Sequence, residues 1–446
     1  MQNWIFYIDL LTNKELFMTH FGVICPPFSG HLNPLAALGR ELRSRGHRVT
    51  FLQIPDIESK VLSEGLNFHP IGQFTYRLGE LDETLAQLGK LSGIEALRYS
   101  VRFCQRTADI ICQDAPTAIK ADGIDVLLVD QLEPAGEAVA EFLSIPFISV
   151  CCAQAIHRSP DVPPFFTPWT YQNTWWARLR NQATYYILDR SCQPILQVLN
   201  DYRRSWKLPV NPKLYASRSQ LAQISQQPAA FDFPCVNLPK HFHYAGPFRN
   251  TSPHKGFFPF ERLTGQPLIY ASLGSMQNTK QDIFECIAAA CEGLDVQLAI
   301  ALGTKVDAET VKKLAGSPLV VEYAPQLEVL AKAKLTITHG GLNTLLDSLT
   351  HGVPLIAIPI TYEQPGNAAR IKWTGTGEIV PLSSLSVSTL RGAIQRVLAE
   401  DVYVDNALRV KQSILEAGGV KRAADIVERS VLKPTTQISQ VLQTAL

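Results

Sequence analysis

The stretch from Tyr323 to Gln364, YAPQLEVLAKAKLTITHGGLNTLLDSLTHGVPLIAIPITYEQ, carries the pattern that decides the fold. The apolar, β-branched run 335–338 predicts a buried strand that ends at Gly340 and Gly341. A helix is predicted over 343–350, because leucines recur on one face and Gly352 follows the last of them. The apolar run 355–359 predicts the next strand. The stretch therefore predicts a βαβ unit with a glycine turn between strand and helix.

This glycine turn is a candidate anion site, because backbone N–H groups and the helix dipole favour negative charge at a helix N-terminus. Asn343 and Asp347 are four residues apart and share one face of the predicted helix. A diphosphate at the turn and a carboxylate one turn further on, near ribose hydroxyls, fit a nucleotide sugar. A Gly-Gly turn by itself is usually only a turn. The sequence contains no Gly-x-Gly-x-x-Gly fingerprint, which argues against a dinucleotide.

The motifs Tyr-Ala-Pro-Gln, Thr-His-Gly-Gly-x-Asn-Thr, Gly-Val-Pro and Glu-Gln follow in order along residues 323–364. Together they resemble the donor-binding signature of the family 1, UDP-dependent glycosyltransferases. The resemblance implies the α/β GT-B fold, in which two doubly wound parallel-sheet domains face each other across a cleft. Tyr323 and Leu342 stand where the plant form has Trp, and Asp347 where it has Glu. Tyr keeps a π face and Asp keeps two acceptor oxygens, so the departures concern base and sugar selectivity.

The same resemblance assigns the donor-binding positions. In this family the opening aromatic residue stacks on uracil, the residues of the glycine turn meet the diphosphate, the carboxylate takes the ribose hydroxyls, and the closing pair binds the sugar. Small hydroxyl residues around a glycine after the strand 268–272 also suit a phosphate or a sugar. The expected donor-binding residues are Ser272, Gly274, Ser275, Tyr323, Gln326, His339, Gly341, Asn343, Thr344, Asp347, Glu363 and Gln364.

The N-terminal half repeats the βαβ pattern. An apolar strand is predicted over 20–25, followed by a helix with Asn33 as N-cap and Pro34 at its first position, and then a strand over 49–54. His31 therefore follows the carboxyl end of a strand, and Asp130 ends another, over 125–130. Ligands bind at this edge of an open parallel sheet.

His31 and Asp130 are the candidate catalytic residues. Gly30-His31-x-Asn-Pro resembles the catalytic-histidine segment of the family, and Val129-Asp130 resembles its partner aspartate. A sugar acceptor hydroxyl needs a base with a pKa near neutral, and a carboxylate orients the imidazole. A lone loop histidine is more often structural, but the donor signature favours catalysis. We expect a direct displacement that inverts an α-linked donor to a β-glycoside.

The domain organisation follows from length and composition. A chain of 446 residues exceeds one ordinary core and suggests two domains. We expect an N-terminal acceptor-binding domain over 18–248, a Pro- and Gly-rich linker over 249–266 and a C-terminal donor-binding domain over 267–431. The last helices are candidates to pack back on the first domain. Residues 1–17 resemble neither a signal peptide nor a membrane span, and Met18 is a candidate start.

An aromatic segment over 163–189, PPFFTPWTYQNTWWARLRNQATYYILD, has the most unusual composition of the chain. One interpretation is a helical hairpin whose aromatic rings fill the core. Others are an apolar acceptor pocket, or a peripheral contact with a membrane, since Trp, Tyr and flanking Arg suit an interface. The expected acceptor-binding residues are Phe28, Phe165, Phe166 and Trp169.

Composition excludes several classes of function. The net charge of +1 provides no basic field for nucleic acid, and nine cysteines without a Cys-x-x-Cys pair suit a reduced cytoplasm. Neither an Asp-x-Asp motif nor a Cys/His cluster indicates a metal. We expect no cofactor, with the UDP-sugar as co-substrate.

Alternatives remain for the reaction and for the acceptor. A nucleotide-sugar epimerase can share the fold, but it does not need the wide aromatic acceptor region. A catalytically inactive binding protein can also share it, but it does not need the His31–Asp130 pair. The segments 130–134, 163–176 and 270–275 resemble bacterial zeaxanthin (carotenoid) glucosyltransferases, which implies glucose transfer to a lipophilic hydroxyl compound. Macrolide, flavonoid and sterol acceptors stay open.

Overall fold

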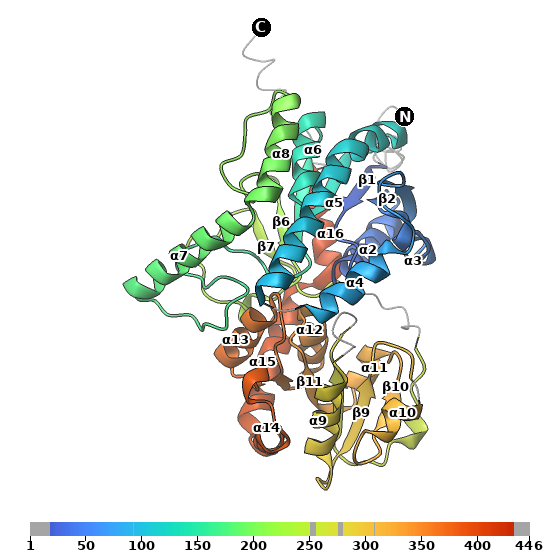
Figure 1. Ribbon diagram of the computed structural model, residues 1–446, viewed down its shortest axis with the longest axis vertical. Helices are drawn as coiled ribbons and strands as arrows, with labels where there is room; N and C mark the ends of the chain where they lie inside the picture. The colour runs from blue at the N-terminus through green and yellow to red at the C-terminus, as the bar shows by residue number, and fades with distance from the viewer. Residues whose placement is uncertain (1–17, 92, 250–255, 275–279, 307, 432–446) are drawn as a thin grey trace, which may run out of the picture.

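Two parallel β-sheets organise the chain (Figure 1), in a computed structural model that describes residues 18–91, 93–249, 256–274, 280–306 and 308–431. The first sheet has the strand order β3-β2-β1-β4-β5-β6-β7, and the second has the order β10-β9-β8-β11-β12-β13. Every strand pairing among these described residues is parallel. The prediction of two doubly wound parallel-sheet domains is confirmed.

The elements alternate between strand and helix along both halves. The strands of the first sheet are β1 His20–Ile24, β2 Arg48–Gln53, β3 Asn67–Pro70, β4 Val126–Asp130, β5 Phe147–Cys151, β6 Gln223–Ser225 and β7 Phe242–Tyr244. The helices of that half are α2 Ser29–Ser44, α3 Glu58–Ser63, α4 Glu80–Lys90, α5 Gly93–Asp122, α6 Pro134–Leu143, α7 Trp175–Ser191 and α8 Gln193–Ser205.

The second sheet consists of β8 Leu268–Ser272, β9 Gln297–Ala301, β10 Leu319–Val321, β11 Ala333–Thr338, β12 Leu355–Ala357 and β13 Gly377–Ile379. Its helices are α9 Gln281–Cys291, α10 Ala308–Lys312, α11 Gln326–Leu330, α12 Leu342–His351, α13 Gln364–Thr374, α14 Val387–Ala399 and α15 Asp401–Ala417. The helix α16 Gly419–Val431 ends the described chain.

Each sheet has a switch point where its strand order reverses, between β1 and β4 in the first and between β8 and β11 in the second. Ligands of open α/β sheets bind beyond the carboxyl ends of the strands at such points. His31 follows β1 and Asp130 ends β4, while Ser272 ends β8 and His339 follows β11. The topology therefore places the two predicted groups of site residues at the two switch points.

Helix α16 returns to the first half of the molecule and packs against α2 (Figure 1). Its apolar residues 423, 424, 426 and 427 belong to the same core as Phe21 and Leu42. At the rim, Arg45 donates to Asp425 at 2.7 Å and to Glu428 at 2.8 Å. The chain's last described helix thus ties the two halves together far from the switch points.

The start of α2 differs from the prediction of Asn33 as N-cap. The helix begins at Ser29 with Phe28 as N-cap, because the N–H groups of His31 and Leu32 both donate to the Phe28 carbonyl at 2.9 Å. Pro34 therefore lies inside the helix. Proline has no N–H, so the carbonyl of Gly30, four residues earlier, loses its helical donor.

The predicted helical hairpin over 163–189 is also wrong in part. Residues 163–174 are irregular, and only α7 is helical. Prolines at 160, 163, 164 and 168 remove backbone donors from this segment, which prevents a continuous helix. Thr174 then caps α7 by accepting from the N–H of Ala177.

Candidate functional site

A histidine–aspartate pair lies at the switch point of the first sheet. Nδ1 of His31, in the first turn of α2, is 2.9 Å from Oδ2 of Asp130. Asp130 is fully buried, and its Oδ1 accepts the N–H of Leu132 at 2.9 Å. The carboxylate is thus fixed by the chain that follows β4, and it occupies one nitrogen of the ring. Nε2 of His31 is left as the nitrogen that can take a proton.

The environment of His31 favours its protonated form. Burial by itself lowers the pKa of His31, but the charge of Asp130 and the hydrogen bond to it outweigh burial, and Glu363 and Glu133 add to this, so the pKa is raised. Burial, with the charge of Asp130, raises the pKa of Glu133 to about 8. Burial also raises the pKa of Glu363, which precedes α13 in the second half of the molecule. The pKa of His31, in the first half of the molecule, is therefore raised in part by the Glu363 carboxyl group of the second half.

His339 occupies the switch point of the second sheet between two glycines. A Cβ at Gly274 would lie 2.8 Å from Cε1 of His339, and one at Gly341 would lie 2.6 Å from Nε2, so a side chain at either position would have to displace the His339 ring. Gly274 also has a positive φ of 70°, which favours glycine. Burial lowers the pKa of His339 to about 4. At neutral pH the ring is uncharged, so it can offer an N–H donor but no cationic charge.

Asp347 lies at the centre of a polar network on α12. Its Oδ2 accepts from Nε2 of Gln326 at 2.6 Å, and Oε1 of Gln326 accepts from the hydroxyl of Tyr270 at 3.1 Å. Its Oδ1 accepts from Nε of Arg249. Asp347, predicted to contact the ribose, and Gln326, another predicted donor-binding residue, are thus brought together by the fold. The sequence does not indicate a role for Arg249, which stands directly after Gly-Pro-Phe at the first position of the predicted linker.

The side chain of Asn343 points toward the first domain. Its Nδ2 donates to the carbonyl of Gly30 at 2.9 Å, and its Oδ1 accepts from Nε2 of Gln226 at 2.9 Å. The glycine turn of the donor signature and the turn that carries His31 are therefore in direct contact.

Some of the remaining donor-binding candidates are exposed, and others are already hydrogen-bonded within the protein. Tyr323 is 54% exposed, while its hydroxyl donates to the carbonyl of Gly303. Gln364 is buried, and its Oε1 accepts the N–H groups of Ile360 and Thr361 at 2.8 and 2.9 Å. Tyr323 is therefore accessible from solvent, whereas the Gln364 side-chain oxygen is occupied by two backbone N–H groups of its own loop. Thr344 is buried in the first turn of α12, and Ser275 lies outside the described residues.

The aromatic candidates for the acceptor lie in two places. Phe28 precedes α2 and contacts Phe103 of α5, with ring centroids 5.5 Å apart. Phe165 and Phe166 contact each other edge to face at 5.4 Å in the irregular segment before α7. All three candidates are half-buried.

Trp169 has a different partner. The guanidinium of Arg180 lies 4.0 Å from the centroid of its ring, which is the geometry of a cation–π contact. The backbone carbonyl of Phe165 lies against Gly366 of α13, where a Cβ would clash with it. The aromatic segment therefore touches the second domain just after Glu363 and Gln364.

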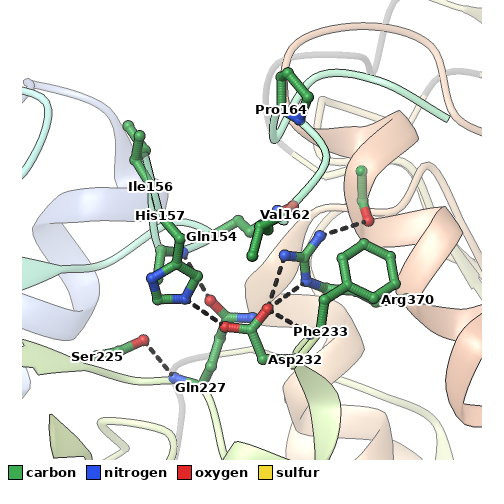
Figure 2. Close-up of polar contacts among 12 residues, drawn as sticks. Gln154, Ile156, His157, Val162, Pro164, Ser225, Gln227, Asp232, Phe233 and Arg370 are labelled. Atoms are coloured by element: carbon green, nitrogen blue, oxygen red, sulfur yellow. Dashed lines mark hydrogen bonds and ion pairs between the residues drawn. The ribbon is translucent and has the colours of Figure 1, made fainter. Parts of the chain in front are cut away.

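A second polar network joins the domains beside this segment (Figure 2). Oδ1 of Asp232 accepts from Nε of Arg370 at 2.8 Å, and Oδ2 accepts from Nε2 of His157 at 2.7 Å. Arg370 is completely buried on α13, with its guanidinium over the ring of Phe233 at 4.2 Å. No local pattern in the sequence indicates this network, since 138 residues separate Arg370 from Asp232.

Within the described part of the chain, no group of three or more His, Cys, Asp or Glu side chains is arranged to hold a metal ion. Among the same residues, no helix is both long and apolar enough to cross a membrane.

Comparison with known proteins agrees with this arrangement. The chain is 36% identical over 415 residues to a zeaxanthin glucosyltransferase of Pantoea ananas, covering 92% of this chain and 96% of the relative. It is 33% identical to another from Pseudescherichia vulneris, covering 93% and 98%. In fold it is similar to the calicheamicin glycosyltransferase CalG4, with a TM-score of 0.73, 22% identity and coverage of 94% and 100%. Residues 69–416 match the profile of one family, and the chain belongs to the UDP-glucoronosyl and UDP-glucosyl transferase family of GT-B glycosyltransferases.

Proposed function

We propose that the protein transfers glucose from UDP-glucose to a hydroxyl group of a carotenoid and forms a β-glycoside. The observation that carries the proposal is the 2.9 Å contact between His31 Nδ1 and Asp130 Oδ2 at one switch point, with the donor signature at the other. The names of the relatives from Pantoea ananas and Pseudescherichia vulneris support zeaxanthin as the acceptor to test first.

In the proposed reaction, Nε2 of His31 takes the proton of the acceptor hydroxyl while its oxygen attacks the anomeric carbon. UDP leaves from the opposite face, so the configuration inverts. Asp130 stabilises the resulting imidazolium. The charge on the leaving diphosphate is met by the N–H groups at the start of α12 and by the neutral ring of His339. The UDP-sugar is a co-substrate, and the proposal includes neither a cofactor nor a metal.

The two halves divide the substrates in this proposal. Residues 18–248 receive the acceptor, with Phe28, Phe165, Phe166 and Trp169 as contacts, and residues 267–431 receive the donor. Segment 249–266 connects them. Tyr323 stacks on the base, Asp347 takes the ribose, and Glu363, whose pKa is raised by burial, lies on the sugar side near His31.

We also propose that the protein acts in the cytoplasm at the membrane surface, with α7 as the contact. This helix extends away from the body of the molecule (Figure 1). Its exposed large apolar side chains are Trp175, Trp176, Leu179, Tyr186 and Ile187. Its exposed positions also carry Arg178 and Arg190 and no acidic residue. Aromatic rings with flanking arginines suit an anionic bilayer, where a carotenoid dissolves.

The deciding experiment is incubation of the purified protein with UDP-glucose and zeaxanthin, with chromatographic detection of the glucosides. Parallel incubations with a sterol, a flavonoid and a macrolide aglycone test the other acceptor classes, and dTDP-glucose tests the nucleotide. Glucosylation of zeaxanthin with release of UDP is the expected result. Transfer to another class alone would replace the carotenoid, and binding of UDP-glucose without any transfer would contradict the catalytic proposal.

A further inference from the structure

The carbonyl oxygen of Gly30 is available to a partner outside its own helix. In a regular helix this oxygen would accept the N–H of residue 34, but Pro34 has none. A carbonyl left without its helical donor needs another partner. That partner comes from the other domain, because Nδ2 of Asn343 donates to it at 2.9 Å. Pro34 therefore leaves a hydrogen-bond acceptor for the other domain one residue before His31.

Asn343 is held in this orientation from its other side. Its Oδ1 accepts from Nε2 of Gln226 at 2.9 Å and from Nη2 of Arg249 at 3.2 Å. Since an amide has two donors and one acceptor oxygen, these bonds decide which end of the side chain faces Gly30.

Arg249 is the centre of this arrangement, and all five of its N–H groups have an acceptor. Nε donates to Asp347. Nη1 donates to Oε1 of Gln226 at 3.1 Å and to the carbonyl of Phe248 at 3.0 Å. Nη2 donates to the main-chain oxygen of Asn343 at 3.1 Å and to its side chain. A lysine has three donors on a point charge and cannot reproduce this planar fork.

We propose that Arg249 is a positioning residue for the transfer reaction. It holds Asp347 for the nucleotide and, through Asn343, ties the glycine turn of the donor site to Gly30 and hence to the turn that carries His31. The distance between the donor-binding residues and the His31 base is thus fixed. A small displacement of the reacting groups lowers the reaction rate strongly. The inference rests on the proposed function, because it assigns these residues to the same reaction.

The two arms of the network predict two different kinetic effects. Arg249→Gln should weaken UDP binding about tenfold and lower kcat about tenfold, because both Asp347 and Asn343 lose their support. Pro34→Ala returns an N–H to α2 that competes for the Gly30 carbonyl. It should lower kcat severalfold and leave the affinity for UDP unchanged. Arg249→Lys should behave as Arg249→Gln does.

The test measures the dissociation constant of UDP by calorimetry, kcat and KM by UDP release, and the melting temperature of each variant. Arg45→Gln is the matched control, because Arg45 also joins the two halves through ion pairs but lies at the α2–α16 contact. The control should keep wild-type kcat and UDP affinity.

Two results would overturn the inference. One is wild-type kcat and UDP affinity in a folded Arg249→Gln protein. The other is wild-type kcat in Pro34→Ala, and this result decides the question when Arg249→Gln does not fold. Failure of the proposed function looks different, because the wild-type protein itself would then bind no UDP or transfer no sugar.

Discussion

Arg370 of α13 and Asp232 of the loop after β6 form an ion pair buried between the two domains, with Nη2 and Oδ1 2.7 Å apart. Oδ2 of Asp232 accepts in addition from His157 and, at 2.9 Å, from the hydroxyl of Tyr244. The pair connects the two domains next to the aromatic segment. Helix α13, which carries Arg370, begins at Glu363 and Gln364, the predicted sugar-binding residues.

Removal of Arg370 should destabilise the protein strongly. Arg370→Ala leaves a buried carboxylate without its cation, which typically costs about 3–5 kcal/mol. The control Arg45→Ala removes a partly exposed ion-pair donor and should cost about 0–1 kcal/mol. Thermal and urea unfolding of both variants measure the difference. Equal losses in the two variants would show that the buried pair has no special role.

The same pair predicts how stability responds to acid. The charges of Arg370 and His157 overcome the effect of burial and lower the pKa of Asp232 far below its usual range. A carboxyl group with a lowered folded-state pKa contributes stability above its unfolded pKa of about 4, and loses it as pH falls toward the folded value. Asp232→Asn should flatten the decline of the melting temperature below pH 4. An unchanged acid decline would contradict this.

The pH dependence of turnover tests His31. The base must be neutral, and the raised pKa of His31 should place the acid limb of kcat/KM above pH 6.5. Asp130→Asn removes the charge that raises this pKa, so the limb should move to lower pH while turnover falls strongly. His31→Ala should abolish transfer and keep UDP binding. A limb at the same pH in Asp130→Asn would refute the assignment, and so would turnover in His31→Ala.

Loss of the Asp347 carboxylate should weaken nucleotide binding. Hydrogen bonds to a charged acceptor are worth about 1.5–3 kcal/mol, so Asp347→Ala should reduce UDP affinity roughly ten- to a hundredfold. It should also remove discrimination between ribose and deoxyribose nucleotides. Calorimetry with UDP and dUDP measures both effects. If both nucleotides bind as they do to the wild type, Asp347 serves only its internal partners Arg249 and Gln326.

Truncation of the aromatic candidates separates an acceptor pocket from a core. Phe165→Ala, Phe166→Ala and Trp169→Ala should raise the KM for the carotenoid and leave the KM for UDP-glucose unchanged. Burial of apolar area contributes about 25 cal/mol per Å², so the acceptor affinity depends on such rings. If the rings only fill the core, the variants should instead lose about 3–5 kcal/mol of stability. Melting curves recorded beside the kinetics distinguish the two cases.

Polar substitutions on α7 should weaken attachment to a membrane. The triple variant Trp175→Ser, Leu179→Ser and Ile187→Ser removes three of the five exposed large apolar side chains of α7. Each such side chain is worth about 1.5–3 kcal/mol when it is buried in a bilayer. Co-sedimentation with phosphatidylglycerol vesicles should fall at least about tenfold, while turnover in detergent stays unchanged. Leu415→Ser, on the exposed face of α15, is the control. Equal vesicle binding by the wild type and the triple variant would exclude α7 as the contact.

The sequence by itself determined the βαβ order, the parallel sheets and the places where strands end, because these follow from local periodicity. Helix α12 ends before Gly352, which adopts the left-handed conformation, as the pattern predicts. His31 lies 2.9 Å from Asp130, as expected from the sequence, because the carboxyl ends of neighbouring parallel strands share one edge.

Only the tertiary structure decided the contacts between domains. Asn343 meets Gly30 across 313 residues, and this contact depends on where α2 starts around Pro34, which the local capping signal misplaced. Arg249 is the first residue of the predicted linker 249–266, and the sequence does not reveal its network, because its acceptors belong to Asp347, Gln226, Asn343 and the neighbouring Phe248. The orientation of a side chain depends on the partners that the fold supplies, and no local pattern specifies partners a hundred or more residues away.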